Sequence, residues 1–341
     1  MADALIWVVA LPLAGAVATL LLPRAATAVV IASGLGTGAA AAALLYGVAT
    51  HGPLDYAIGG WSAGLGIALR ADALSALLVM MTALVALAAS VYSSAYFNKA
   101  RQRARFGPLW LLLWTALNAL LLSGDLFNLY VTLELLGLSA VALAALAGSA
   151  AAVRAALRYL LVGLLGSMLF LAGVSLIYAG YGTLDLAALA QVVEAGPAVW
   201  PALALMTAGL LLKTALFPLH FWLPPAHASA PAPVSAVLSA LVVKAAFYLV
   251  LRLWLDVFAD VVTPAAATLL GALGAAAVLW GSWHALLAER LNKAVVLHGD
   301  GSDQSLLAEE NIGEMDAVVT LTNDEETNIL ASLLTRRMGI R

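Results

Sequence analysis

The chain has 341 residues and a net charge of −3 at pH 7; 64% of its residues are hydrophobic, 10% are charged, and none is cysteine. A soluble domain of this size cannot bury so much apolar surface, so the composition excludes an ordinary globular protein and predicts a polytopic membrane protein. The absence of cysteine excludes disulfides and thiolate metal sites, and nothing in the composition indicates a nucleic-acid partner.

Apolar runs near 20 residues long recur along most of the chain, and each could cross a hydrocarbon layer of about 30 Å as a helix. Nine such runs cover residues 4–22, 26–50, 72–92, 108–124, 126–147, 156–180, 199–217, 232–254 and 263–288. Helix is the required form because backbone groups in lipid must be hydrogen-bonded within their own segment. The predicted fold is therefore all-α, with about nine transmembrane helices, one of them broken.

Basic residues are confined mainly to alternate loops, which predicts the orientation. Short cytoplasmic loops gather Lys and Arg. Four such loops, all on one side of the predicted membrane, hold Arg24; Lys99, Arg101, Arg103 and Arg105; Arg154 and Arg158; and Arg290 with Lys293. The other side has only Arg70 and Arg252 beside five acidic residues. We predict a multi-pass protein of the inner (plasma) membrane with its N-terminus outside, an uncleaved first span and a cytoplasmic C-terminal tail.

Between the second and third runs, residues 51–72 alternate glycine with apolar and aromatic residues, a pattern that favours extended structure or turns. We expect an external hairpin or loop here, with an unstructured linker as the alternative. Asp72 and Asp125 both stand at predicted helix starts, where a carboxylate accepts backbone hydrogen bonds and is favoured by the helix dipole. Their expected role is capping.

Glu134 lies eight residues into an otherwise apolar helix, where its short side chain cannot reach water. Such a carboxyl stays ionised only beside a cation. Two hypotheses remain open. Glu134 forms a fixed ion pair with a lysine and tethers two helices, or it sets the proton affinity of that lysine during a transport cycle.

The stretch from Leu210 to Leu251 carries two lysines, Lys213 and Lys244, within apolar runs. A lysine at the centre of a membrane helix costs about 2.5–3.5 kcal/mol on an insertion scale, so it usually faces a partner or a water-filled path. Five prolines lie between them, and Pro218 should break the helix. Freed carbonyls inside a bilayer must be buried in protein or face water. The pattern indicates an ion path.

Two histidines, His220 and His227, follow the predicted break. They lack a third metal ligand nearby, so we expect relay or loop-anchoring roles and no metal site. Trp222 is expected at the membrane interface. Glycines in the sixth run should allow close helix packing and carry no chemistry: Gly163, Gly166, Gly173 and Gly180.

Three segments together resemble a known family. They are GDLFNLYVTLELLGLSA, LLKTALFPLHFWLPPAHASAPAPVSAVLSALVVKAAFYLVLR and the loop GGWSAGLGIALRADALSAL over residues 59–77. Residues 1–291 are similar to the proton-translocating membrane subunits of Mrp-type cation/proton antiporters and of respiratory complex I, nearest to the antiporter D-subunit type. The resemblance implies that Glu134, Lys213 and Lys244 form a lateral proton path, and that His220 and His227 lie in a loop beside it.

The last 50 residues differ in kind, since they hold 13 of the 35 charged residues. Their pattern predicts strand, helix, strand and helix over residues 292–341, and HGDGSD and VVTLTNDEETNI resemble part of the RCK nucleotide-binding domain of potassium-transport regulators. The predicted fold of the tail is a small α/β Rossmann-like half-domain. A G-x-G-x-x-G fingerprint is missing, so we expect no NAD or other cofactor.

These features lead to alternative functions. The first is a membrane subunit, partnered by other subunits of an antiporter or complex I-like assembly, that translocates protons in exchange for a monovalent cation such as sodium. It would have no catalytic site of its own and at most belong to an NADH:quinone oxidoreductase assembly. The second is an inactive truncated or fused fragment, because the family continues with an inverted repeat that this chain lacks. In a third, weaker hypothesis the tail senses a ligand.

Overall fold

The computed structural model describes residues 3–60, 66–98 and 100–287. Contacts divide the chain into two compact units, residues 1–277 and 278–341. The elements discussed below belong to the first unit, except for the end of the last helix. The α/β half-domain predicted for residues 292–341 lies outside the described residues.

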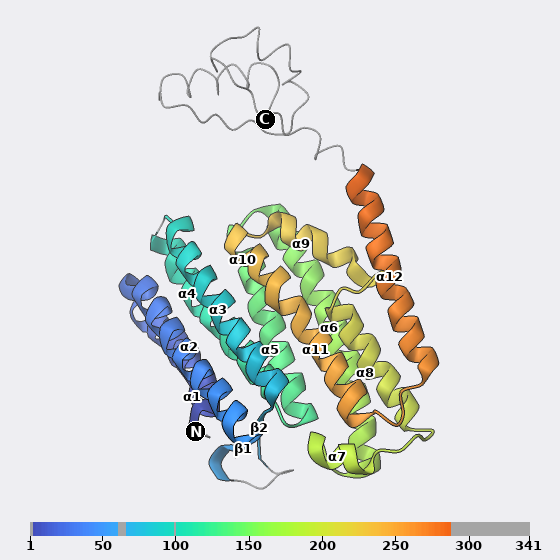
Figure 1. The fold of residues 1–341 in the computed structure, drawn as a ribbon. Coiled ribbons are helices and arrows are strands. Elements are labelled where there is room, and N and C mark those ends of the chain that lie inside the picture. Colours follow the sequence, from blue (N-terminus) through green and yellow to red (C-terminus); the bar gives the residue numbers. More distant parts are fainter. Residues whose placement is uncertain (1–2, 61–65, 99, 288–341) are drawn as a thin grey trace, which may run out of the picture. The chain divides into compact units, whose positions relative to one another are not determined.

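The first unit is a bundle of helices that run side by side and alternate in direction (Figure 1). The long helices are α1 (Asp3–Leu21), α2 (Ala26–His51), α3 (Ala73–Tyr96), α4 (Ala100–Leu121), α5 (Leu126–Ala144), α6 (Ala150–Tyr181) and α12 (Pro264–Leu287). Shorter pieces are η1 (Pro23–Ala25), η2 (Ile58–Gly60), η3 (Ala145–Ala147), α7 (Leu186–Val192), α8 (Val199–Lys213), η4 (Leu219–Trp222), α9 (Leu223–Ser229), α10 (Ala232–Val237), η5 (Leu238–Val242), α11 (Val243–Arg252) and η6 (Leu253–Val257). The segments η5 and η6 are π-helical and make α10 to η6 one continuous rod.

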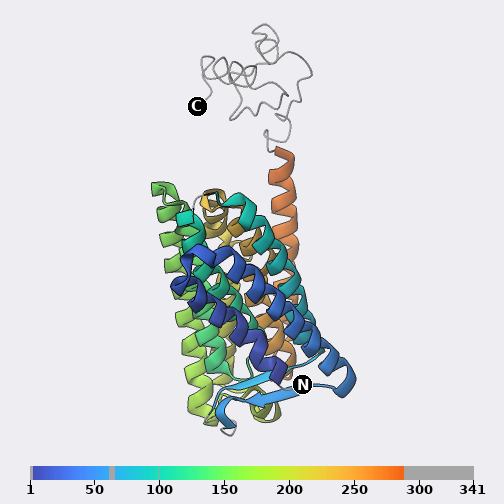
Figure 2. The ribbon, with the colours of Figure 1, turned by 90° about the vertical axis from the view of Figure 1, so that its left-hand side faces the viewer.

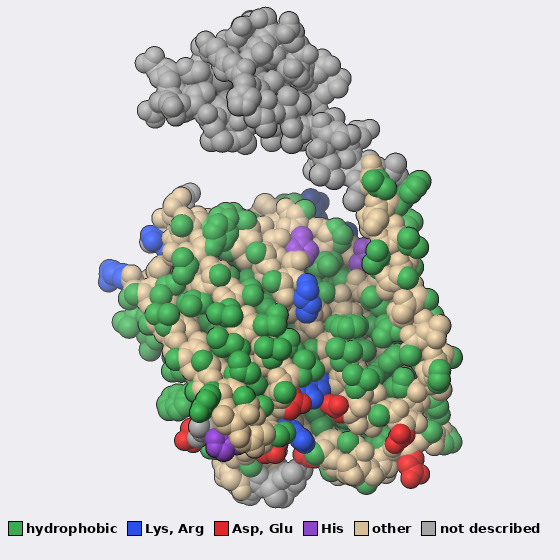
Figure 3. All heavy atoms as spheres, in the orientation of Figure 1, with side chains coloured by type: hydrophobic (Ala, Val, Ile, Leu, Met, Phe, Trp, Pro, Cys, Tyr) green, Lys and Arg blue, Asp and Glu red, His purple; other side chains and the backbone are tan. Residues whose placement is uncertain are grey.

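Within the described residues, eight helices are long and apolar enough to cross a membrane, counting α10 to η6 as one, and α8 is a shorter apolar helix. These nine correspond to the nine predicted runs, and the all-α membrane fold is confirmed. Apolar side chains cover the visible face of the unit (Figure 3), and many large ones are exposed, such as Leu20, Leu161 and Leu255. Such a surface fits contact with lipid rather than water.

A two-stranded antiparallel hairpin closes one end of the bundle (Figure 2). Its strands β1 (Leu54–Ala57) and β2 (Ala68–Ala71) pair in the register Leu54 to Ala71 and Ala57 to Ala68, which confirms the predicted hairpin. The Arg70 N–H donates to the Leu122 carbonyl over 2.7 Å, so the hairpin is bonded to the end of α4. We call this the hairpin end. The opposite end, which carries η1 and the starts of α4 and α6, is the basic end.

Both predicted caps are confirmed. Asp72 caps α3, accepting from the Ser75 N–H over 2.9 Å while the Ser75 hydroxyl accepts from the Asp72 N–H. Asp125 caps α5 by accepting from the Asn128 N–H over 2.7 Å. Burial raises the pKa of Asp125, and bonds from the backbone N–H groups of Asn128 and Phe127 offset only part of that rise.

Helices α6 and α8 approach each other closely because glycines face one another. A Cβ built on Gly209 would overlap the Gly166 carbonyl oxygen, and one on Gly173 would overlap the Met206 side chain. Any side chain at these positions would force the helices apart. The predicted packing role is therefore confirmed for Gly166 and Gly173. Gly163 and Gly180 have nothing within 4 Å of such a Cβ, so the prediction is wrong for them.

The predicted break is present but begins earlier than Pro218. Helix α8 ends at Lys213, and the chain then turns through Ala215, with a φ of 52°, before a cis Phe217–Pro218 bond. A proline ring clashes with the carbonyl four residues before it, here Thr214, so the helix must end ahead of that residue. Trp222 is 2% exposed, and its indole N–H donates over 3.1 Å to the Leu212 carbonyl, which also accepts from the Ala215 N–H over 3.3 Å. The predicted interface position of Trp222 is therefore wrong.

Candidate functional site

Glu134 and Lys213 meet in the interior of the bundle. The Lys213 Nζ lies 3.2 Å from the Glu134 Oε1. The Lys213 side chain is 9% exposed and the Glu134 side chain is 18% exposed. Glu134 comes from the middle of α5 and Lys213 from the last turn of α8, where the helix breaks. An ionised pair here satisfies two charges that would each be costly alone in an apolar interior.

A third side chain contacts this pair. The Ser167 hydroxyl on α6 donates to Glu134 Oε1, the same oxygen that accepts from Lys213. Ser167 is fully buried, between the two helices that carry the charges. Sequence reasoning missed it, although its position directly after Gly166, on the closely packed face of α6, was an available signal.

Two glycines make room for the lysine. A Cβ on Gly137 would lie 3.6 Å from the Lys213 Nζ, and one on Gly166 would lie 3.1 Å from the Lys213 Cγ. The stem of Lys213 therefore lies along the backbone of α6 while its ammonium reaches α5. Helices α5, α6 and α8 together fix where the charge sits.

A small cavity adjoins the pair. Glu134 and Lys213 line it together with Tyr159, Trp222 and apolar side chains, and about 30 Å³ is open to the centre of a water molecule. One water needs roughly 10–15 Å³ by that measure, so the cavity has room for at least one water beside the charges. The rings of Tyr159 and Trp222 stack with centroids 4.4 Å apart and form one wall.

The other predicted site residues do not join this cavity. Val242 of η5 and Ala246 of α11 line it, but Lys244 lies between them in sequence and is exposed on another face of the helix, where its Nζ donates to the Ser239 carbonyl. His227 Nδ1 lies 2.8 Å from the Ser235 hydroxyl oxygen, and the His220 ring stacks on Phe217. The structure thus brings together Glu134 and Lys213 and leaves the remaining three outside.

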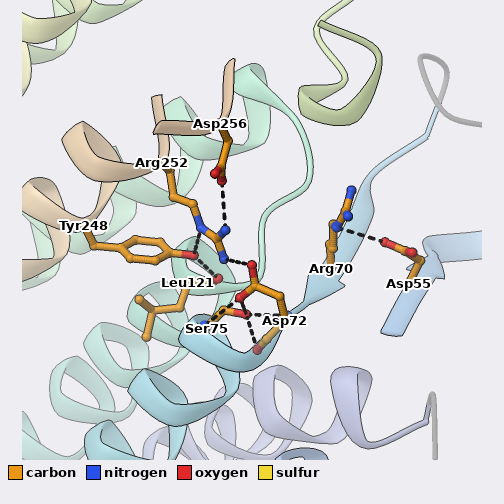
Figure 4. Close-up of polar contacts among 8 residues, drawn as sticks. All are labelled: Asp55, Arg70, Asp72, Ser75, Leu121, Tyr248, Arg252 and Asp256. Atoms are coloured by element: carbon orange, nitrogen blue, oxygen red, sulfur yellow. Dashed lines mark hydrogen bonds and ion pairs between the residues drawn. The ribbon is translucent and has the colours of Figure 1, made fainter. Parts of the chain in front are cut away.

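A second polar cluster lies at the hairpin end (Figure 4). The Arg252 guanidinium lies 2.5 Å from a carboxylate oxygen of Asp72 and 2.9 Å from one of Asp256, and its Nε donates to the Tyr248 hydroxyl over 2.8 Å. That hydroxyl donates to the Leu121 carbonyl over 3.0 Å. Arg252 therefore links α11 to the start of α3, to Asp256 of η6 and, through Tyr248, to the end of α4.

Burial alone would raise the pKa of Asp72. The Ser75 N–H and the Arg252 guanidinium outweigh burial and hold this pKa below the ordinary aspartate value. Sequence reasoning predicted the cap at Asp72 but not its bond to a residue 180 positions away. A cavity of about 370 Å³ opens beside the cluster.

Among the described residues, no three His, Asp or Glu side chains lie close enough to hold a metal ion. The pair and its cavity offer a lysine that can gain or lose a proton, a carboxylate to receive it, and space for a bridging water. Proton transfer is the chemistry that this arrangement allows.

Comparison with known proteins adds to this geometry. Residues 123–296 match the family model described as NADH:quinone oxidoreductase/Mrp antiporter, TM. Residues 284–340 match the TrkA-N domain model, in agreement with the resemblance noted for the tail.

Individual relatives point the same way. The chain is 38% identical over 289 residues to the N subunit of NADH-quinone oxidoreductase from Desulforudis audaxviator, covering 81% of this chain and 57% of the relative. It is 40% identical over 214 residues to the D-type subunit of a probable K(+)/H(+) antiporter from Rhizobium meliloti, covering 60% and 38%. A chain in the structure of the Mrp complex from Dietzia sp. DQ12-45-1b superimposes with a TM-score of 0.69 at 31% identity, covering 75% and 49%. This chain thus spans about half the length of these relatives.

Proposed function

Since the chain belongs to the family of NADH:quinone oxidoreductase and Mrp antiporter membrane proteins, we propose that it is a subunit that moves protons through the membrane in exchange for a monovalent cation such as sodium. Relatives named as D-type antiporter subunits and as the N subunit of NADH-quinone oxidoreductase both support a membrane subunit of this kind. The exchanged cation and the assembly are parts of the proposal.

One observation carries it: the buried contact between Glu134 and Lys213 beside a cavity that fits water. In this proposal Lys213 is the group that takes up and releases the proton, and Glu134 controls how firmly the proton is held. Ser167 shares Glu134 Oε1 with Lys213 and keeps the carboxylate aimed when the ammonium loses its proton or moves away.

Onward transfer to Lys244 remains part of the proposal, with His227 and His220 as relays. Lys244 and the cavity occupy different faces of α11, so transfer requires a water chain around the helix or a rotation of it. The π-helical turn η5 directly precedes α11 and supports this part of the proposal, since single π-turns within helices are frequent at functional sites.

The proposed setting is the inner membrane, among other subunits of an antiporter or complex I-like assembly. Arg24, the first turns of α4 and the start of α6 supply arginines at the basic end, and this supports a cytoplasmic position for that end. The hairpin end, with Asp72 and Asp256, would then face outward.

The test is ion exchange in inside-out vesicles from cells that lack their own antiporters. The chain is expressed with and without the partner subunits of an antiporter operon, and the collapse of a proton gradient on adding sodium or potassium is followed by a pH-sensitive dye. We expect cation-dependent collapse when the partners are present. Its loss in Glu134→Gln, with the protein still in the membrane, supports the assigned pair.

Absence of exchange in every subunit combination, with the chain inserted and folded, would contradict the proposal and favour a non-transporting fragment. Equal exchange by the native chain and by Glu134→Gln would support transport by this chain but show that protons do not pass through the Glu134–Lys213 pair.

A further inference from the structure

The basic end carries a cavity that the proposed proton route does not use. It has a volume of about 680 Å³ and lies between η1, the first turns of α2 and the start of α4. Arg24 of η1 and Arg103 of α4 both line it. We call it the arginine cavity. Two guanidinium groups from segments almost 80 residues apart thus share one hollow at an end of the bundle.

Neither arginine has an acidic partner among the described residues, where the ion pairs involve Arg70, Lys213 and Arg252. The sequence explains why: residues 4–54 and 73–124 contain no Asp or Glu. The nearest acids in sequence lie at the other end of helices more than 15 residues long, which places them about 25 Å or more away. Figure 3 shows the acidic side chains gathered toward the hairpin end on the visible face. Arg103 donates to the Asn98 carbonyl over 3.5 Å, a bond to a neutral group that leaves its charge uncompensated. The charge in the arginine cavity is therefore available to a ligand.

The rest of the lining is apolar. Ile31 and Leu35 stand one turn apart on α2 and form a strip that runs from the arginines toward the middle of the helix. Leu35 is 57% exposed. The arginines, at the end of a transmembrane helix, would lie at the level of the lipid headgroups. The apolar strip, nearer the middle of the helix, would lie at the level of the hydrocarbon chains.

We propose that the arginine cavity binds one anionic phospholipid, with its phosphate between Arg24 and Arg103 and an acyl chain along Ile31 and Leu35. A guanidinium fork suits phosphate oxygens, which it contacts through two parallel hydrogen bonds. Basic pockets between transmembrane helices favour anionic headgroups. A free phosphate ion would meet the same arginines but would leave the apolar strip uncovered, so the strip favours a lipid.

The test uses the full chain, purified in a neutral detergent and stripped of lipid. It is titrated with dioleoylphosphatidylglycerol, with dioleoylphosphatidylcholine and with inorganic phosphate, and bound molecules are counted by native mass spectrometry. We expect one tightly held phosphatidylglycerol and no saturable binding of the other two. In the double variant Arg24→Gln, Arg103→Gln, binding should weaken about thirty-fold, since each arginine near a membrane surface contributes about 1 kcal/mol, a factor of about five.

A matched control separates a built site from general attraction to a basic surface. Arg101→Gln, Arg105→Gln removes the same total charge, from the helix that also carries Arg103, but both side chains are exposed and neither lines the cavity. We expect this variant to bind as the native chain does. Equal weakening by both double variants would overturn the proposal in favour of diffuse electrostatics. Saturable binding of inorganic phosphate at the same strength would also overturn it, because the apolar strip would then contribute nothing.

The apolar strip has its own test. Leu35→Ser should weaken binding of dioleoylphosphatidylglycerol several-fold and leave a short-chain dihexanoyl analogue unaffected. An equal effect on both lipids would show that the acyl chain does not lie on α2. Neither measurement depends on ion exchange, so a failure here leaves the proposed transport function untouched, and the reverse also holds.

Discussion

Two pairs of opposite charges join distant helices in this bundle, and they differ in ways that suit different tasks. Glu134 and Lys213 lie in the interior, 3.2 Å apart, with a small cavity beside them. Asp72 and Arg252 lie at the hairpin end, 2.5 Å apart, next to a larger cavity. The first pair uses a lysine and the second an arginine.

The surroundings sharpen that contrast. Arg252 contacts two carboxylates and a tyrosine hydroxyl, so its fixed guanidinium is held from three directions. The Lys213 ammonium has one protein carboxylate and otherwise faces the cavity. Guanidinium keeps its proton at every physiological pH, whereas an ammonium in an apolar site can release one. Arg252 therefore acts as a tether at the hairpin end, and Lys213 has the chemistry that the proposed function requires of a proton carrier.

The largest effect is expected from replacing the lysine of the interior pair with arginine. Lys213→Arg keeps the charge and the contact with Glu134 but removes any practical loss of the proton. We expect cation-dependent proton exchange in vesicles to fall about a hundredfold or more, in line with the usual loss when a proton-transfer group is removed. The amount of folded protein, read by size-exclusion chromatography, should stay near the native level.

The mirror variant, Arg252→Lys, serves as the control. It keeps a positive charge near Asp72 but gives up the fork that bonds Asp256 and Tyr248 as well, so it should reduce stability while leaving most of the exchange activity. Exchange that survives in Lys213→Arg and disappears in Arg252→Lys would invert the assignment of the two pairs.

Ser167→Ala is expected to have the next largest effect. Without the hydroxyl, the Glu134 carboxylate loses one of the two donors that aim it at Lys213. One hydrogen bond to a charged group is worth about 1.5 kcal/mol, a factor of about ten. We expect exchange to slow by about that factor and its pH profile to move. Tyr159, Glu134 and Lys213 are the titratable groups that line this cavity.

Ser139→Ala is a matched control for that variant. Ser139 is 2% exposed on α5, and its hydroxyl has no hydrogen-bond partner among the described residues. Its removal should leave the pH profile unchanged, and Ser167→Thr, which retains a hydroxyl, should restore the native profile in part. A profile that stays in place in Ser167→Ala would show that Ser167 serves packing only.

The interior pair was predictable from the sequence because its members are charged residues within apolar runs, and such residues need a partner whatever the fold. Ser167 was not, because a serine in a membrane helix is inexpensive and only its neighbours reveal a role. The face occupied by Lys244 was equally hidden. Val242 and Ala246, two positions before and after Lys244, line the cavity, and Lys244 does not. The orientation of the helix about its own axis decides which of these residues face the cavity, and that orientation depends on packing.

The hairpin end also contains a contact that could not be predicted from the sequence. Asp72 was correctly predicted as a cap because capping is local, a matter of the four residues around a helix start. Its bond to Arg252 joins segments 180 residues apart and depends on how α3 and α11 lie in the bundle. The break in α8 was predicted from Pro218, and its true start follows from the clash of the proline ring with the carbonyl of Thr214.

Removing the tether should lower stability rather than transport. We expect Arg252→Gln to reduce the free energy of unfolding by about 2 kcal/mol, between the values typical of exposed and of buried ion pairs, because the side chains of Arg252 and Asp72 are 19% and 27% exposed. Thermal unfolding in detergent measures this. Asp72→Asn keeps the cap, since asparagine caps helices as well as aspartate does, and removes only the charge. Strict additivity of the two changes in the double variant would contradict a direct ion pair.

The smallest effect concerns pH and follows from the sign of the shift at Asp72. Burial would raise its pKa, but the Ser75 N–H and Arg252 hold it below the ordinary value of about 3.9, so the native state favours the ionised form. The stabilisation is fully present above that ordinary value and is lost as the pH falls through the lowered pKa of the folded protein. The groups that face Asp72 are Arg252 and Ser75, with Tyr248 and Asp256 reached through Arg252, which stays charged throughout.

The difference in melting temperature between the native chain and Asp72→Asn should therefore be constant from pH 7 to about pH 5 and shrink below pH 4. A difference that persists undiminished at pH 3 would mean that the carboxylate contributes through its shape and hydrogen bonds, and that Arg252 gains nothing from its charge.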